Sequence, residues 1–264
     1  MNILLLNYRR PDLSARARTF IQHARPDTVL LACDGPAEGE HEIIAAVHQA
    51  LAGDWGCPVA RRYSAAHRGC KWGVVEGINW AFTLVPELIV LEDDIIPEPT
   101  FFPFASEMLD RYRTATRIFS VSGCRDPGEI LPTSESYSFR RRPYIWGWAT
   151  WHRAWQHYDP DIKAWPLFRD HPGFHPPAHS GEFRLNLDRV HAGQLDTWDY
   201  QWQFTHLQHD ALGIFPRHNL IENDGFDLRA THTRCTLDRR PACSQPLAFP
   251  LVHPTTIMPE PSGR

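Results

Sequence analysis

Short apolar runs alternate with helix-like stretches along the first half of the chain. Runs at residues 3–6, 28–33 and 87–91 have the continuous hydrophobic character of buried strands, and each ends in turn-forming or acidic residues. A shorter strand is expected at 59–63, and apolar residues at helical spacing predict helices at about 12–23, 40–51 and 72–82. Strands separated by helices predict an α/β fold, Rossmann-like, with a mostly parallel central sheet covered by helices on both faces.

The pattern changes after about residue 121. Tryptophans cluster between 146 and 165, prolines and histidines crowd residues 170–180, and helical spacing returns only at 181–190. We expect this part to be a loop-rich cap that shares the core of the first half. The proline-rich end, from about Asp238, is expected to be a loosely held tail.

Composition and charge exclude several classes of protein. The chain has 264 residues, of which 42% are hydrophobic and 22% charged, as in a soluble globular protein large enough for one sizeable domain. A formal net charge of −4 argues against a nucleic-acid partner bound through phosphate neutralisation. No apolar run approaches the roughly 20 residues of a membrane-spanning helix, so no transmembrane segment is expected. The first residues also lack the features of a secretory signal.

The six cysteines are spread along the chain without a C-x-x-C pair. In the absence of a secretion signal we expect free thiols in a reducing compartment. A Cys235–Cys243 disulfide, or a zinc site that includes His232, is the alternative.

Three polar segments follow the predicted strands and should meet at one rim of the sheet. They are residues 7–12, 34–36 and 92–94. Ligands of open α/β sheets bind outside the carboxyl ends of the strands, so this rim is the expected binding site. Both the G-x-G-x-x-G fingerprint and the P-loop are absent from the sequence.

Glu92, Asp93 and Asp94 form an acidic run directly after the strand at 87–91. Adjacent carboxylates repel one another unless a cation or a hydrogen-bond donor offsets their charge. Mn²⁺ and Mg²⁺ prefer oxygen ligands and often take one or two carboxylates together with substrate phosphates. An acidic turn that stabilises the next helix through its dipole is the alternative. The position at the rim favours metal binding.

The run Glu92-Asp93-Asp94 resembles the acidic metal motif of GT-A glycosyltransferases. The chain is most similar to the bacterial hemolysin-like, family-2-type sugar transferases, with likeness to the N-acetylglucosaminyltransferase I family. Five further segments match in the order in which they occur in that group. They are Asn7-Tyr8-Arg9-Arg10-Pro11, Cys33-Asp34-Gly35-Pro36, Trp146-Gly147-Trp148-Ala149-Thr150-Trp151, Trp198-Asp199-Tyr200-Gln201-Trp202 and Asn223 to Thr233.

The resemblance implies a role for each acid of the run. Asp94 would bind the metal that bridges the donor diphosphate, Asp93 would face the ribose or a metal-bound water, and Glu92 would face the donor sugar. In the same group Asp34 and Arg10 match residues that contact the nucleotide, Asp34 the base and Arg10 the base or ribose. Asp34-Gly35-Pro36 is also good turn chemistry on its own.

The loop at residues 66–72 departs from the group, because its usual Asn-x-Gly segment lacks the asparagine here. Gly69 fits that pattern. Arg68 and Lys71, with His67, could approach a diphosphate through charge-assisted hydrogen bonds. A solvated basic loop is the alternative.

Asp199 matches the carboxylate of the W-D motif that serves as general base in the resembled enzymes. Inverting sugar transfer needs such a group to take the proton of the acceptor hydroxyl. Asp196 is the rival in the same stretch, and an aspartate that caps a helix N-terminus is the other reading of Asp199. Gly147 and Trp148 would line the donor pocket, although core packing is the commoner role of tryptophan.

Histidines supply the last candidates. The resemblance implies that His232 completes the metal site with Asp94. His171, His175 and His179 recur every four residues, but the prolines among them prevent the helix that would align them for zinc. We expect a loop near the acceptor site instead.

The sequence therefore predicts a glycosyltransferase, dependent on Mn²⁺ or Mg²⁺ and inverting, that uses a nucleotide-diphosphate sugar, with a UDP-sugar as first choice. The acceptor would be a glycan, a lipid-linked molecule or a small molecule. A nucleotidyltransferase of similar fold and a non-catalytic carbohydrate-binding relative are the alternatives. Residues 1–264 would form a single GT-A domain, with a nucleotide-sugar half at 1–122, an acceptor half at 123–237 and the tail at 238–264. The expected location is the cytoplasm, either free or at the periphery of the inner membrane.

Overall fold

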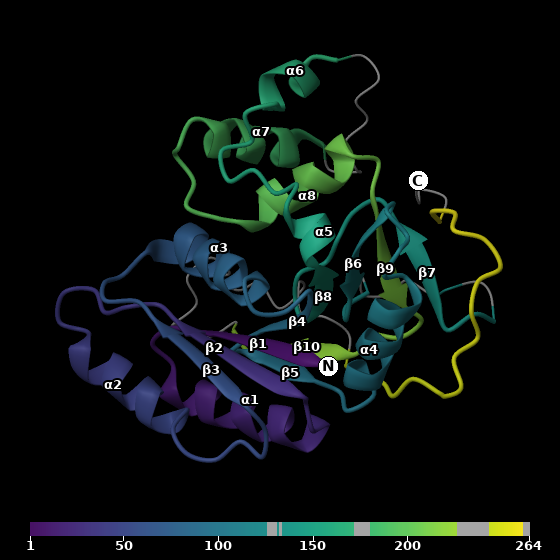
Figure 1. The fold of residues 1–264 in the computed structure, drawn as a ribbon. Helices are drawn as coiled ribbons and strands as arrows, with labels where there is room; N and C mark the ends of the chain where they lie inside the picture. The colour runs from purple at the N-terminus through teal and green to yellow at the C-terminus, as the bar shows by residue number, and fades with distance from the viewer. Residues whose placement is uncertain (126–130, 132–133, 172–179, 226–242, 261–264) are drawn as a thin grey trace.

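Helices cover both faces of an eight-stranded sheet in the computed structural model, which describes residues 1–125, 131, 134–171, 180–225 and 243–260 (Figure 1). The sheet order is β3-β2-β1-β4-β8-β6-β9-β7, and β10 pairs with β5 in a separate ribbon. The strands are β1 (Asn2–Asn7), β2 (Thr28–Cys33), β3 (Val59–Tyr63), β4 (Glu87–Glu92), β5 (Ile95–Pro97), β6 (Ile118–Ser122), β7 (Tyr137–Arg140), β8 (Trp148–Trp151), β9 (Leu212–Pro216) and β10 (Ile221–Asn223). The helices are α1 (Pro11–Ala24), α2 (His41–Ala50), α3 (Gly69–Phe82), α4 (Phe101–Arg111), α5 (His152–Trp155), α6 (Trp165–Arg169), α7 (Ser180–His191) and α8 (Asp199–Gln208).

The first half of the chain forms the parallel side of the sheet. Strands β3, β2, β1 and β4 are neighbours in that order, and each pair runs parallel. Helices connect them, as a parallel connection requires. The predicted α/β class and the mostly parallel central sheet are therefore confirmed, together with the helices expected at 12–23 and 40–51.

Alternation along the strands divides the apolar residues between two faces. Leu5 and Leu31 belong to the core under α1, α2 and α4, whereas Leu4 and Leu30 belong to the core under α3, α5 and α8. A smaller cluster joins α6, α7 and α8 above the second face, at the top of Figure 1. Because a strand side chain changes face at every residue, a continuous apolar run fills both cores at once.

Strands of the second half extend the same sheet. β8 is antiparallel to both β4 and β6, β9 is parallel to β6, and β7 closes the edge antiparallel to β9. The sequence pattern did not predict these strands. Trp148–Trp151 is buried on both faces and shows no alternation, and β9 contains Gly213 and ends at Pro216, which are uncommon in strands.

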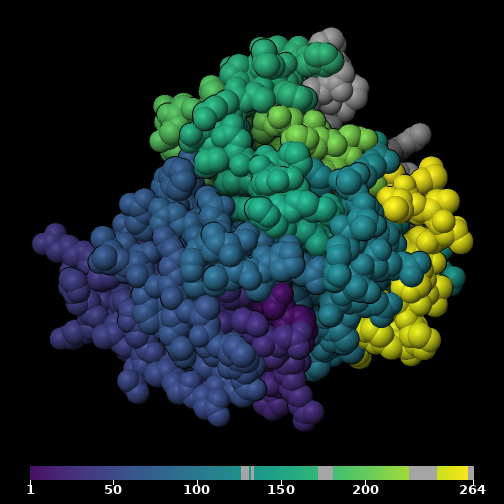
Figure 2. Space-filling model, in the orientation of Figure 1, coloured from purple at the N-terminus to yellow at the C-terminus, as the bar shows by residue number. Residues whose placement is uncertain are grey.

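The C-terminal residues 243–260 pack along one side of the molecule, the yellow band of Figure 2. Leu247 and Leu251 are buried in the larger core. The buried Arg125 donates hydrogen bonds to the Pro216 carbonyl (2.8 Å) and to Glu260 (3.1 Å). The expectation of a loosely held tail is therefore wrong for these residues, because two leucines and an ion pair hold a segment that lacks regular structure.

No helix in the described residues is long and apolar enough to cross a membrane. Cys33, Cys57 and Cys70 are free thiols. Cys235 lies outside the described residues, so the structure leaves the disulfide and zinc alternatives untested.

His206 on α8 is fully buried against Phe119. Its Nδ1 lies 3.0 Å from the Trp202 carbonyl oxygen, so Nδ1–H donates there, and Nε2 accepts from the Ser120 hydroxyl at 2.9 Å. Burial lowers the pKa of this imidazole to about 3. The folded protein therefore keeps His206 neutral.

We predict that His206 makes stability fall in mild acid. Its folded pKa lies below the value of about 6.5 in an unfolded chain, so only the unfolded state takes up this proton between those values. The stabilisation is complete above about pH 6.5 and is lost as pH falls towards 3, by up to about 1.4 kcal/mol per pH unit. Urea unfolding at pH 4, 5, 6 and 7 should show a flatter dependence in His206→Gln than in the parent.

His41→Gln is the matched control, because His41 is exposed at the start of α2. Its dependence should equal that of the parent. A His206→Gln protein with the parent's slope would contradict the prediction.

Candidate functional site

The carboxyl ends of β1, β2 and β4 meet at one rim of the sheet. Glu92 is the last residue of β4 and is in register with Leu6 of β1. The Asp34 N–H, directly after β2, donates to the carbonyl of Asn7 (3.0 Å). The structure therefore brings together the three polar segments that the sequence places at the binding rim.

Arg10 bridges two acids of the run. Its Nη1 lies 2.9 Å from Asp94 Oδ2, and its Nη2 contacts Asp93 Oδ1. The side chain of Asp93 is only 2% exposed and that of Arg10 17%. Burial lowers the pKa of Arg10, but the two carboxylates outweigh burial and raise it. Arg10, expected at the base or ribose, thus organises the acidic run in this structure.

The run carries more negative charge than Arg10 offsets. Three carboxylates and one guanidinium leave an excess of two negative charges when all are ionised. Burial, followed by Asp94 and Asp93, raises the pKa of Glu92 to about 8. Burial also raises the pKa of Asp93 to about 6, although Arg10 opposes the shift. Without a further cation Glu92 keeps its proton at neutral pH.

The donor set fits a hard divalent cation. All the side-chain donors of the run are oxygens, and Asp93 Oδ2 is buried with no hydrogen-bond partner among the described residues. No group of three His, Cys, Asp or Glu side chains converges on one point within the described part of the chain. The described side chains alone do not complete the shell of a cation here, and the oxygens of a bound ligand such as phosphate are suitable further ligands.

The end of β10 packs directly against Asp94. The Asp224 N–H donates to the Asp94 carbonyl (2.9 Å), and a Cβ atom at position 225 would lie 2.1 Å from Asp94 Oδ2. A side chain at position 225 would have to displace the Asp94 carboxylate. The Asn-Asp-Gly tripeptide is a turn signal in the sequence, but its contact with Asp94 is a tertiary feature. His232 lies in 226–242, outside the described residues.

Asp34 binds protein groups in this structure. Its Oδ1 accepts the N–H groups of Gly35 (2.8 Å) and Arg68 (2.9 Å), and Oδ2 lies 2.7 Å from His67 Nδ1. The His67 ring stacks on Tyr8 with 4.6 Å between ring centroids. Asp34 thereby fixes the loop before α3 beside the end of β1.

Arg68 and Lys71 are paired with carboxylates outside the acidic run. Arg68 donates through Nη2 (2.6 Å) and Nε (3.1 Å) to Glu76, and Lys71 Nζ lies 3.0 Å from Asp161. The two cations expected at a diphosphate are thus engaged within the protein.

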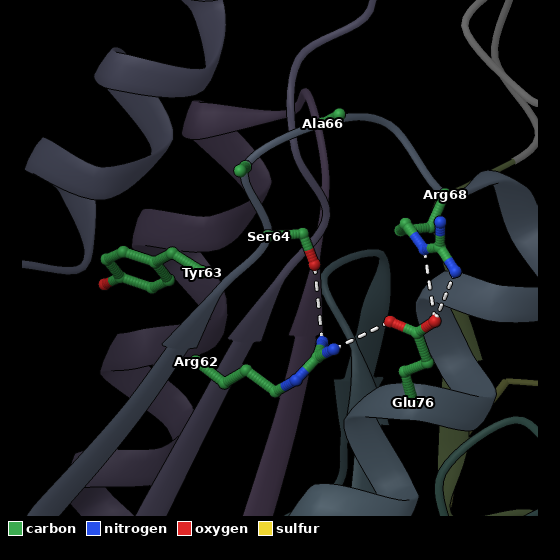
Figure 3. Close-up of a pocket in the computed structure, with 7 residues that line it drawn as sticks. Arg62, Tyr63, Ser64, Ala66, Arg68 and Glu76 are labelled. Atoms are coloured by element: carbon green, nitrogen blue, oxygen red, sulfur yellow. Dashed lines mark hydrogen bonds and ion pairs between the residues drawn. The ribbon is translucent and has the colours of Figure 1, made fainter.

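A surface hollow of about 410 Å³ lies beside the end of β3. Arg62 and Arg68 reach Glu76 from two sides (Figure 3). The residues that line this hollow are Arg62, Tyr63, Ser64, Ala65, Ala66, Arg68 and Glu76. The acidic run does not line this hollow.

Asp199 is the first residue of α8 and is half-buried. Its Oδ1 accepts a hydrogen bond from the Thr197 hydroxyl. Its charge also contributes, after burial and the two neighbouring acids, to the raised pKa of Glu92. The beginning of α8 and the end of β4 are therefore close enough to interact through charge.

Asp196, the rival of Asp199, binds the start of α3. Its Oδ2 accepts the Cys70 N–H (2.9 Å) and its Oδ1 accepts the Lys71 N–H (3.0 Å). These are two of the amides that a helix leaves without an internal partner. The cap comes from more than 120 residues away, so no local sequence signal marks it.

Trp148 and Gly147 have packing roles in this structure. Trp148 is 1% exposed, and its ring lies 5.6 Å from Trp198 and 5.7 Å from Trp202. Gly147 has φ +57°, and a Cβ there would lie 2.4 Å from Ile221. Trp148 supports α8 from within the core rather than presenting a surface for a ligand. Of the recurring histidines, His171 is exposed, and His175 and His179 lie outside the described residues.

No family model matches the chain, and no curated protein matches it in sequence. A UDP-glucose pyrophosphorylase complexed with UDP-glucose aligns with TM-score 0.39 and 8% identity, over 82% of this chain and 90% of its own. Mannose-1-phosphate geranyltransferase from Thermus thermophilus aligns with 0.40 and 16%, over 82% and 74%. Mouse xyloside xylosyltransferase 1 in apo form aligns with 0.34 and 10%, over 80% and 83%. Likeness of this size carries no information about the reaction.

We predict that Arg10→Gln destabilises the fold by about 3 kcal/mol at pH 7, because it leaves the buried Asp93 without its counter-charge. The loss should shrink at pH 5, since Asp93, with a pKa already raised to about 6, then takes up a proton. Urea unfolding at the two pH values measures both effects. Arg16→Gln, which removes an exposed pair with Asp224, should change stability by less than about 1 kcal/mol. Equal losses in the two variants would contradict the prediction.

Proposed function

We propose that this protein is an inverting, metal-dependent glycosyltransferase of GT-A type, which transfers a sugar from a nucleoside diphosphate to an acceptor hydroxyl. One observation supports the proposal above the others. An acidic run, of which Asp93 is buried, ends the central strand β4 with an excess of negative charge, and the charge of a further carboxylate, Asp199 at the start of α8, acts on Glu92 of that run. This pairing suits a cation-bound leaving group next to a general base.

Asp94 is the proposed metal ligand from the run, with the donor diphosphate supplying further oxygens. A bound Mn²⁺ or Mg²⁺ would neutralise the charge that develops on the leaving diphosphate. Arg10 holds the Asp94 and Asp93 carboxylates in place through its two contacts. Glu92 can hydrogen-bond a hydroxyl group of the sugar, as a donor while it holds its proton and as an acceptor once a bound cation lowers its pKa.

Asp199 is the proposed general base. The Thr197 hydroxyl binds its Oδ1, and Oδ2 has no hydrogen bond to the described residues. Oδ2 is therefore available to take the proton of an acceptor hydroxyl as that oxygen attacks the anomeric carbon. A single displacement of this kind inverts the anomeric centre.

We also propose that Asp34, Arg68 and Lys71 contact the nucleotide sugar. To do so, each residue would exchange a bond that it now makes within the protein for one to the donor. A UDP-sugar is the first donor to test. Release of free nucleoside diphosphate supports sugar transfer, whereas release of pyrophosphate from a sugar phosphate and a nucleoside triphosphate would indicate a nucleotidyltransferase.

We predict that Asp94→Asn abolishes the gain in nucleoside diphosphate affinity that Mn²⁺ gives the parent. The amide cannot supply the anionic oxygen that a hard cation prefers, and we expect a loss of about tenfold or more. Calorimetric titration with uridine diphosphate, with and without Mn²⁺, measures the gain. If the variant gains as much from Mn²⁺ as the parent does, Asp94 is not the ligand.

Asp210→Asn is the matched control for that titration. Asp210 also pairs with two arginines, Arg117 and Arg141, but it lies before β9 and far along the chain from the run. Asparagine tolerates its positive φ of +48°. This variant should keep the full effect of Mn²⁺.

We predict that Asp199→Asn keeps the affinity for nucleoside diphosphate and lowers kcat by about 10²–10⁴-fold, the usual contribution of a positioned general base. The same calorimetry and a sugar-transfer assay measure the two quantities. A variant with parental turnover would exclude Asp199 as the base.

A further inference from the structure

The loop before α8 and the start of α3 are joined by one side chain. Asp196 lies three residues before Asp199, and its carboxylate accepts the N–H groups of both Cys70 and Lys71. Asp34 binds the N–H of Arg68 at the N-cap position, the Arg68 side chain itself makes no capping hydrogen bond, and among the described residues the Asp196 side chain is the one that accepts the amides of Cys70 and Lys71. The first turn of α3 and the loop that carries Asp199 therefore depend on the same carboxylate.

The backbone of α3 is shaped to admit this carboxylate. Gly69 has φ +81°, in the left-handed region that favours glycine, and a Cβ atom there would lie 2.7 Å from Asp196 Oδ2. A larger residue would push the carboxylate away from the amides. Gly69 and Asp196 thus form a clamp, which we define as the Asp196 carboxylate, the two amides it binds and the glycine that makes room for it.

The residues between Asp196 and Asp199 are held by contacts of their own, so the position of the clamp also fixes the position of Asp199. The Thr197 hydroxyl binds the Asp199 carboxylate, and the Tyr158 hydroxyl donates to the Trp198 carbonyl (3.1 Å). The Trp198 ring is 2% exposed and stacks on Trp148 of β8. Between Asp196 and Asp199 the chain therefore has little freedom, because each residue is anchored.

Within the proposed function, which makes Asp199 the general base, we infer that Asp196 is a positioning residue. Its carboxylate ties the α8 entry to the α3 N-terminus and so sets where Asp199 stands relative to the acidic run. A displacement of about 1 Å in such a group can slow a reaction by about 10²-fold. Asp196 itself has both oxygens engaged and makes no proton transfer.

The test compares Asp196→Ala, Asp196→Asn and Asp161→Ala. Asp196→Ala should lower kcat by about 10–100-fold and raise KM for the nucleotide sugar by a smaller factor, because the released first turn of α3 carries Lys71, a single member of the proposed set of donor contacts. Asp196→Asn keeps one acceptor oxygen and should recover most of kcat. Asp161→Ala removes an ion pair with the Lys71 ammonium at the same helix end but no backbone cap, so it should retain the parent's kcat.

Hydrogen exchange supplies a readout that does not depend on activity. In Asp196→Ala the amides of Cys70 and Lys71 should exchange at least about tenfold faster, and those of residues 197–201 should follow. Gly69→Ala, which displaces the carboxylate without removing it, should give the same exchange pattern.

The outcomes separate the clamp from the proposed function. Parental kcat in Asp196→Ala, with an inactive Asp199→Asn, would overturn the positioning role and leave the base assignment standing. If Asp199→Asn is active, Asp199 is not the base, and the hydrogen exchange of residues 197–201 is then the test of whether the clamp positions the α8 entry. Unchanged exchange at those residues in both Asp196→Ala and Gly69→Ala would overturn that role of the clamp.

Discussion

The negative charge at the end of β4 governs how the residues at the rim of the sheet are arranged. Three consecutive carboxylates lie where a central strand leaves the sheet, and among the described residues the guanidinium of Arg10 pairs with two of them. Arg10 occupies the N-cap position of α1, three residues after the end of β1, so the parallel pairing of β1 with β4 brings the counter-charge to the acids. The proton on Glu92, whose pKa burial and its acidic neighbours raise, relieves one of the two remaining negative charges.

Aromatic packing holds the other side of the site. Trp148, Trp155, Trp198 and Trp202 meet beneath α8, with ring centroids 5.2–6.4 Å apart in the contacting pairs. These rings are rigid and almost fully buried, so they fix α8 against β8 and α5. Because β8 lies next to β4 in the sheet, the same cluster sets the distance between the beginning of α8 and the acidic run.

The polar residues around the rim therefore fall into two groups, those that hold the backbone in place and those to which we assign chemistry. Asp34, Asp196 and Arg10 hold loops and helix ends in place through hydrogen bonds to backbone amides or to other side chains. Asp94 and Asp199 keep oxygens that the described residues do not fully occupy, and they are the groups to which we assign chemistry. The distinction rests on what each carboxylate already binds, which the residue type alone does not reveal.

The α/β class, the strands of the parallel half and the rim where polar residues gather could be predicted from the amino-acid sequence, because apolar periodicity is a local property. It also placed Glu92, Asp93 and Asp94 after a buried strand. Three features came from long-range contacts: Arg10 pairs with those acids, Trp148 faces the core, and α3 begins at Gly69 rather than near residue 72. The early start of α3 depends on a cap from Asp196, and such a contact has no local signature because its two partners are distant in the chain. The sequence pattern did not predict strands β8 and β9. Burial on both faces, or a glycine in the strand, removes the alternation of apolar and polar residues by which a strand is recognised.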